Sequence, residues 1–138
     1  MRRPSRRRPP LRLVGAHVVD PSGLSPAPDR PCEKRSISDA AGLSELGCHR
    51  YEADPGEQIP LAYHVHEQQE EVFYVLDGTL SVETPEGTYE VAAGEAFVVE
   101  PGSPQRAYND ADADGPLRAL VDHADLDPAE YCLVHGGS

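Results

Sequence analysis

No run of apolar residues in this 138-residue chain approaches the length of about 18 that a membrane-spanning helix requires. No hydrophobic segment follows the basic start of the chain, so a secretory signal is not expected. The three cysteines, Cys32, Cys48 and Cys132, are widely spaced and form no CxxC pair. This usage argues against a disulfide framework and favours a reducing compartment. We therefore expect a cytoplasmic protein without a membrane partner.

Positive charge is scarce outside the first residues of the chain. The formal net charge is -12, and Lys34 is the single lysine. Residues 1–15 hold six arginines and no acid, which leaves 24 acids against 6 bases, a net charge of -18, for residues 16–138. Such an acidic body repels nucleic acid and anionic membranes, so neither is expected as a partner. It is also typical of proteins from a salt-rich cytoplasm, which predicts a halophilic source.

Helical periodicity is almost absent, and no glycine-rich phosphate loop, nucleophile elbow or Ser/His/Asp constellation is visible. Short alternating or β-branched stretches separated by turn residues predict an all-β barrel or jelly roll. The expected strands cover residues 48–53, 72–76, 79–84, 88–92, 96–99, 106–109 and 117–121. One short helical turn is expected within residues 36–46, capped by Ser38 or Asp39 and weakened by Gly42.

The length predicts one domain with a single core. Residues 1–35 contain a basic, proline-rich tail and then a proline-rich loop, so we expect an extended, largely disordered segment there. The barrel domain is expected over residues 36–123. Residues 124–138 form a C-terminal tail in this division of the chain.

Two histidines one residue apart, His64 and His66, are the main chemical feature of the sequence. Side chains two apart on a strand point to the same face, so both imidazoles aim the same way. A polar turn follows, and the apolar strand 72–76 then returns with a carboxylate at its start. Two imidazoles and one carboxylate suit a divalent first-row metal. His49, on the expected strand 48–53, could face the barrel interior, but it is more simply interpreted as a packing or surface residue.

The pattern His64-x-His66-x4-Glu71-x6-Gly78 resembles the first motif of the cupins, a superfamily of small β-barrels. A segment similar to the second cupin motif follows over residues 94–109, where Gly94, Gly102 and Asn109 occupy the family's positions. The resemblance spans roughly residues 45–122. It departs from the family at Gln58 and Glu100, which replace a turn glycine and a turn proline. It also departs at Gln105, where the family has a third metal-binding histidine.

The resemblance implies a cupin-like jelly-roll barrel with a metal site. Carried over residue by residue, the ligands are His64, His66 and Glu71, with Glu70 as the alternative carboxylate. Gln105 is either a fourth ligand or a group that hydrogen-bonds a ligand. The implied cofactor is a divalent transition metal (Fe, Mn, Ni or Zn). Side chains expected to line a pocket for a small-molecule ligand are Tyr63, Phe73 and Tyr108.

Three functions stay open at this point. The first is a metal-dependent enzyme, a dioxygenase or an isomerase of cupin type. The second is a non-catalytic cupin that binds or senses a metal or small molecule, which the loss of a histidine at Gln105 favours. The third is a metal-free cupin in which His64 and His66 exchange protons. Apolar residues on both faces of strand 72–76 indicate a second partner surface, so a homodimer is expected.

Overall fold

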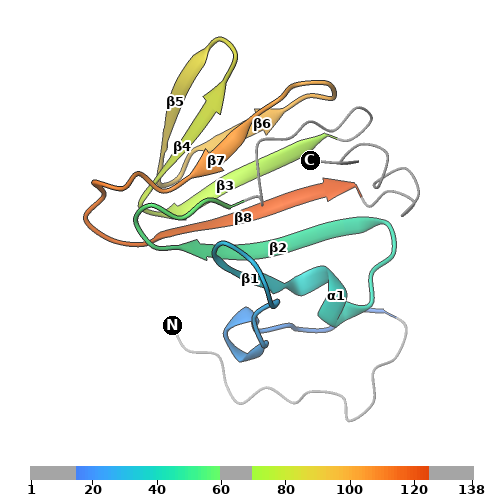
Figure 1. Ribbon diagram of the computed structural model, residues 1–138. Helices are drawn as coiled ribbons and strands as arrows, with labels where there is room; N and C mark the ends of the chain where they lie inside the picture. Colours follow the sequence, from blue (N-terminus) through green and yellow to red (C-terminus); the bar gives the residue numbers. More distant parts are fainter. Residues whose placement is uncertain (1–14, 60–69, 125–138) are drawn as a thin grey trace.

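The computed structural model describes residues 15–59 and 70–124 (Figure 1). Two antiparallel sheets make up this part of the chain, with strand orders β1-β2-β8-β3-β6 and β5-β4-β7. The strands are β1 (Glu33–Ser36), β2 (Leu46–Ala53), β3 (Glu71–Asp77), β4 (Thr79–Thr84), β5 (Gly87–Ala92), β6 (Ala96–Val99), β7 (Arg106–Tyr108) and β8 (Leu117–Ala124). The helical elements are short, η1 (Pro21–Gly23) and α1 (Ile37–Ala41). The all-β prediction is therefore confirmed.

The core lies between the two sheets, and the alternation of buried and exposed positions along β2, β3 and β8 builds much of it. On β3, Phe73 and Val75 are buried, whereas Tyr74 and Leu76 are exposed. This is the arrangement expected for a strand with one face on the core. The buried apolar side chains come from both sheets and from two positions outside them: Cys32, Tyr51, Ala53, Ile59, Phe73, Val75, Leu80, Val82, Val91, Val99, Ala107, Leu117, Ala119 and Val121.

The expected strands are observed with small differences at their ends. β8 continues three residues beyond the predicted end at residue 121, because its full length pairs with β2 from Leu46 to Ala53. The predicted hairpin joins β4 to β5, and the hydroxyl of Thr84 closes it by donating to the carbonyl of Gly87 and accepting from the N–H of Glu86. The length of β8 thus depends on its cross-strand partner, which the local sequence pattern does not specify.

The predicted cap of the short helix was wrong. Ser36, not Ser38 or Asp39, is the N-cap of α1, and its side chain accepts a hydrogen bond from the N–H of Asp39. Gly42 does not weaken the helix but ends it, in the left-handed conformation that glycine adopts without strain. Ser38 instead turns inward and bonds the backbone of Cys48 on β2, which ties α1 to the large sheet.

The segment before the two-histidine motif lies against β7. The Ile59 N–H donates to the carbonyl of Ala107 at 2.9 Å, and Gln58 forms a β-bridge with Tyr108. Asn109, fully buried, donates from its side-chain amide to the carbonyls of Ala53 and Gly115. These bonds bring the chain into the small sheet immediately before the candidate metal motif.

Candidate functional site

Glu71 opens β3 with its side chain on the inner face of the large sheet. The residue is 7% exposed, and in the sheet it faces His123 of β8 on one side and Val99 of β6 on the other. Its neighbour Glu70 is exposed. Of the two carboxylates considered from the sequence, Glu71 is therefore the one that lies in the interior.

Gln105 lies immediately before β7 and is 1% exposed. Its amide nitrogen donates to Glu71 Oε1 at 3.5 Å, a long hydrogen bond that joins the two sheets. The amide oxygen of Gln105 is buried and has no hydrogen-bond partner within residues 15–59 and 70–124. A buried acceptor without a partner costs about 1–3 kcal/mol, so this oxygen is a place where a cation or a donor group would be stabilised.

Burial also controls the charge of the carboxyl group. Removal from water raises the pKa of Glu71 from 4.5 to about 7, because the charged form loses more solvation than the neutral one. A nearby metal ion would act in the opposite direction and favour the carboxylate. Glu71 and Gln105 thus supply two oxygen atoms in an interior where a cation would improve the environment of both.

These two residues are compatible with a divalent cation, since carboxylate and carbonyl oxygens are ligands for hard ions such as Mn²⁺. Within the described ranges, no group of three or more His, Cys, Asp or Glu side chains is arranged to hold a metal ion. His64, His66 and Tyr63 lie outside the described residues. The described chain stops before this segment at Ile59, which is hydrogen-bonded to Ala107 of β7, and β3 begins after it at Glu71.

The other two predicted pocket residues occupy different environments. Phe73 is 1% exposed and belongs to the apolar core. Tyr108 alternates with the buried Ala107 on β7, and its ring lies under the guanidinium of Arg106 at 4.3 Å. Neither residue is among those lining the cavity described next.

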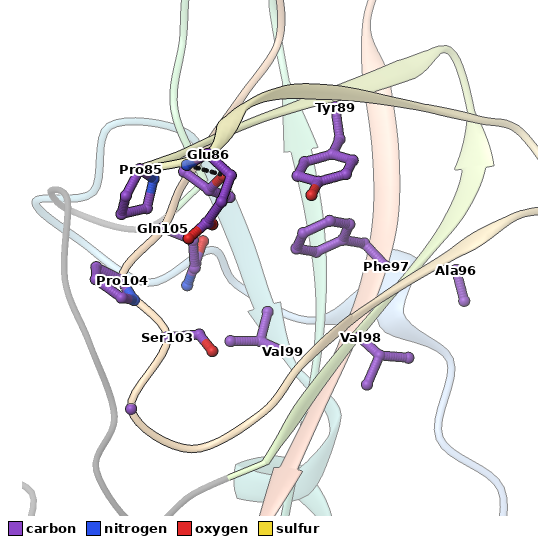
Figure 2. Close-up of a pocket in the computed structure, with 12 residues that line it drawn as sticks. Pro85, Glu86, Tyr89, Ala96, Phe97, Val98, Val99, Ser103, Pro104 and Gln105 are labelled. Atoms are coloured by element: carbon purple, nitrogen blue, oxygen red, sulfur yellow. Dashed lines mark hydrogen bonds between the residues drawn. The ribbon is translucent and has the colours of Figure 1, made fainter.

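A cavity of about 610 Å³ opens between the edges of the two sheets, beside Gln105 (Figure 2). Tyr89 of β5 and Phe97 of β6 pack against each other on one side of it, with ring centroids 5.4 Å apart and ring planes tilted by 54°. Gln105, Ser103 and Glu86 provide polar atoms at the other end. The lining residues are Thr84, Pro85, Glu86, Tyr89, Ala96, Phe97, Val98, Val99, Gly102, Ser103, Pro104 and Gln105. These lining residues, all from the described part of the chain, include no lysine, arginine or histidine.

His49 and His123 form a contact that the sequence interpretation missed. His49 is 7% exposed on the inner face of β2, and its Nε2 lies 3.2 Å from Nε2 of His123 on β8. The sequence predicts a tail from residue 124, which places His123 at the end of the barrel segment, and it predicts no role for this histidine. The alternation of His49 with buried Tyr51 and Ala53 was the available signal for its inward direction.

A comparison with protein families matches the model described as "Cupin domain" to residues 49–121, more than half of the chain. The chain belongs to the cupin family. The matched range agrees with the span of 45–122 expected from the motifs. A comparison with curated protein sequences finds no match. No helix within the described parts of this cupin is long and apolar enough to cross a membrane.

Solved structures support the same assignment. A protein proposed to be a sugar phosphate isomerase, from Acidithiobacillus ferrooxidans, is 29% identical with a TM-score of 0.63, and the match covers 70% of this chain but 60% of that one. The polyketide cyclase RemF from Streptomyces resistomycificus is 23% identical with a TM-score of 0.68, covering 83% and 82% of the two chains. A predicted oxalate decarboxylase from Thermotoga maritima is 19% identical with a TM-score of 0.66, covering 79% and 99%. The last two show the fold, and the jelly-roll prediction is confirmed.

Proposed function

We propose that this cupin binds a divalent transition metal through His64, His66 and Glu71, with the amide oxygen of Gln105 as a fourth ligand. The observation that carries the proposal is the buried, unpartnered oxygen of Gln105, the residue whose amide nitrogen contacts Glu71. A cation there would satisfy the oxygen and would also favour the ionised form of Glu71. Fe, Mn, Ni and Zn all accept such a mixture of nitrogen and oxygen ligands.

We further propose that the cavity beside Gln105 holds an uncharged small organic molecule. The contacting rings of Tyr89 and Phe97 give the cavity an apolar aromatic wall, and the polar atoms of Ser103 and Gln105 suit a hydroxyl or amide group. Among the described residues of the lining, Glu86 carries a charge and none is basic. The carboxylate of Glu86 disfavours phosphorylated substrates, so we do not carry over the sugar phosphate activity in the name of one similar structure.

The metal would supply Lewis-acid polarisation of a bound oxygen atom. The chain's own residues would do the rest. Gln105 would hold Glu71 in place through its amide nitrogen, and the aromatic pair would orient the substrate towards Gln105, which lines the same cavity. If the protein is an enzyme, we favour an isomerase or a dioxygenase. The alternative is a cupin that binds metal and ligand without turnover, which the amide in place of a third imidazole supports.

Metal content tests the first part. We expect the untagged chain purified without chelator to contain metal, and its metal content to fall by about one equivalent per chain in His64→Ala and in Glu71→Gln. Glu70→Gln is the matched control, because it removes an exposed neighbouring carboxylate and must leave the metal in place. Gln105→His should tighten binding. A metal-free wild type, or equal metal in Glu71→Gln and Glu70→Gln, would contradict the proposal.

Ligand binding tests the second part. Uncharged aromatic or hydroxylated compounds should raise the unfolding temperature of the metal-loaded protein, and their phosphorylated analogues should not. Tyr89→Ala should abolish the shift, whereas Leu43→Ala, which changes an exposed apolar residue outside the cavity, should not. Turnover of a bound compound, followed by oxygen consumption or product analysis, separates the enzyme from the binder.

We also propose that the protein is a homodimer, and that the outer face of β3 and β6 forms its interface. Val72 pairs with Val98 and Tyr74 with Ala96 on this face, so apolar side chains lie side by side across two strands. Val98 is 62% and Tyr74 43% exposed. Contact between two copies of this face would remove these side chains from water.

A further inference from the structure

We infer that His49 and His123 form a second cation site, which binds an imidazole-preferring divalent ion such as Zn²⁺ between their Nε2 atoms. The site is separate from the ligand set proposed above, since it uses no residue of that set. It lies on the inner face of the large sheet, where His123 faces Glu71 of the neighbouring strand.

The distance between the two nitrogens is the first argument. They lie 3.2 Å apart. Zinc binds imidazole nitrogen at about 2.0–2.1 Å, so two nitrogens on one tetrahedral ion are separated by about 3.3 Å. The rings therefore hold almost the spacing that a shared ion requires, and little movement is needed to admit one.

The hydrogen bonds of the far nitrogens are the second argument. Nδ1 of His123 lies 3.1 Å from the carbonyl oxygen of Ala124, which can only accept, so the proton of the neutral ring is on Nδ1. Its Nε2 is then a lone pair directed at His49. A backbone carbonyl that holds the far N–H is the usual support of a metal-binding histidine.

Ser36 supports His49 in the same way. The Ser36 hydroxyl lies 2.9 Å from Nδ1 of His49 and 3.3 Å from the hydroxyl of Ser38. In the metal-free protein, Nε2–H of His49 then donates to Nε2 of His123. Binding of an ion requires the His49 proton to move to Nδ1, where the Ser36 hydroxyl accepts it while donating to Ser38, and both Nε2 lone pairs then face the ion. Burial, followed by the charge of Lys34, lowers the pKa of His49 to about 4, so this ring is neutral and able to bind a cation near pH 7.

Gly47 provides the space for this arrangement. A Cβ atom at Gly47 would lie 2.2 Å from Cε1 of His123, so any side chain there displaces the ring. His123 is half-buried, which leaves a route for an ion. Within residues 15–59 and 70–124 no third histidine, cysteine or carboxylate completes the site.

The test uses the full chain with His64→Ala and Glu71→Gln, which remove the first site. After chelator treatment, we expect added Co²⁺ to produce a visible absorption band that saturates at one equivalent per chain. Added Zn²⁺ should remove this band by displacing Co²⁺. Adding Gly47→Ala should weaken binding at least tenfold, because it moves one imidazole without removing it. Adding Gly23→Ala instead, where the new Cβ meets nothing within 4 Å, should leave binding unchanged.

A second variant covers the case in which Gly47→Ala fails to fold. Adding His123→Ala changes a half-buried residue and should also abolish the signal, whereas adding His17→Ala should not. No cobalt signal in the double variant, or an equal signal with and without His123→Ala, would overturn the inference. Neither result depends on the first site, because its ligands are already removed. If the first proposal is wrong, the single variant His64→Ala will contain as much metal as the wild type.

Discussion

At the residue scale, two buried ionisable groups are shifted in opposite directions by the same cause. Burial raises the pKa of Glu71 to about 7 and lowers the pKa of His49 to about 4, because each group loses solvation of its charged form. Each shift corresponds to a free energy of about 3 kcal/mol. Both residues point into the barrel, so the interior favours neutral side chains until a cation enters.

The metal-free protein should show these shifts as opposite pH dependences of stability. The folded state of Glu71 binds a proton more tightly than the unfolded state, so its contribution is complete below pH 4.5 and is lost as pH rises towards 7. His49 binds a proton less tightly when folded, so its contribution is complete above pH 6.5 and is lost as pH falls towards 4. The two slopes partly cancel in the wild type.

Urea unfolding between pH 4.5 and 7.5, with chelator present, separates them. Relative to wild type, Glu71→Gln should gain about 3 kcal/mol over this rise in pH, because the variant has no carboxylate to ionise. The wild type loses the contribution of His49 to stability as pH falls below 6.5, because folded His49 resists protonation. The free energy of unfolding of His49→Gln should therefore rise relative to that of the wild type as pH falls from 7.5 to 4.5. A Glu71→Gln variant that follows the wild type at every pH would show that Glu71 ionises normally.

At the scale of elements, the turn between β3 and β4 is the most constrained of those around the site. Gly78 has φ +81°, and a Cβ there would lie 2.8 Å from the carbonyl oxygen of Pro116. Gly94, in the turn before β6, has φ +88° but meets nothing within 4 Å. The two glycines therefore share a backbone conformation and differ in their surroundings.

Alanine substitution at both positions measures this difference. Gly94→Ala should lower the free energy of unfolding by about 1 kcal/mol, the cost of a left-handed alanine. Gly78→Ala should cost about 2–4 kcal/mol, since the backbone of the loop before β8 must also move. Urea unfolding gives both values, and equal losses would mean that contact with Pro116 contributes nothing.

At the scale of the whole molecule, the acidic surface and the apolar outer face of β3 and β6 favour different states. Residues 16–138 carry a net charge of -18, which keeps copies apart, whereas the exposed side chains of Val72, Tyr74 and Val98 favour association. The halophilic source inferred from the composition stays a prediction, as do the cytoplasmic location and the lack of nucleic-acid and membrane partners.

Mass measurement in solution tests the dimer. We expect the wild type to sediment as a dimer in moderate salt, where charge repulsion is screened. Val98→Lys combined with Tyr74→Lys should give a monomer, because buried unpaired charges would disrupt the apolar contact. Leu43→Lys, at an equally exposed apolar residue elsewhere, should stay dimeric. A monomeric wild type at high protein concentration would contradict the proposal.

The sequence by itself determined the all-β class, the positions of most strands and the family. Alternation and turn residues depend on neighbours a few positions away, so strands such as β3 and the β4–β5 hairpin could be placed within a residue or two. The spacing of His64, His66 and Glu71 indicated the cupin resemblance for the same local reason.

Only the tertiary structure decided which side chains meet. Gln105 reaches Glu71 from 34 residues away, and His49 reaches His123 from 74 residues away. These contacts depend on the register of strands that are distant in the chain, and one residue of slip would turn every side chain to the other face. The space that Gly47 leaves for His123 is likewise set by the partner strand. Periodicity shows that a side chain points inward, but the neighbour that it finds there comes from packing.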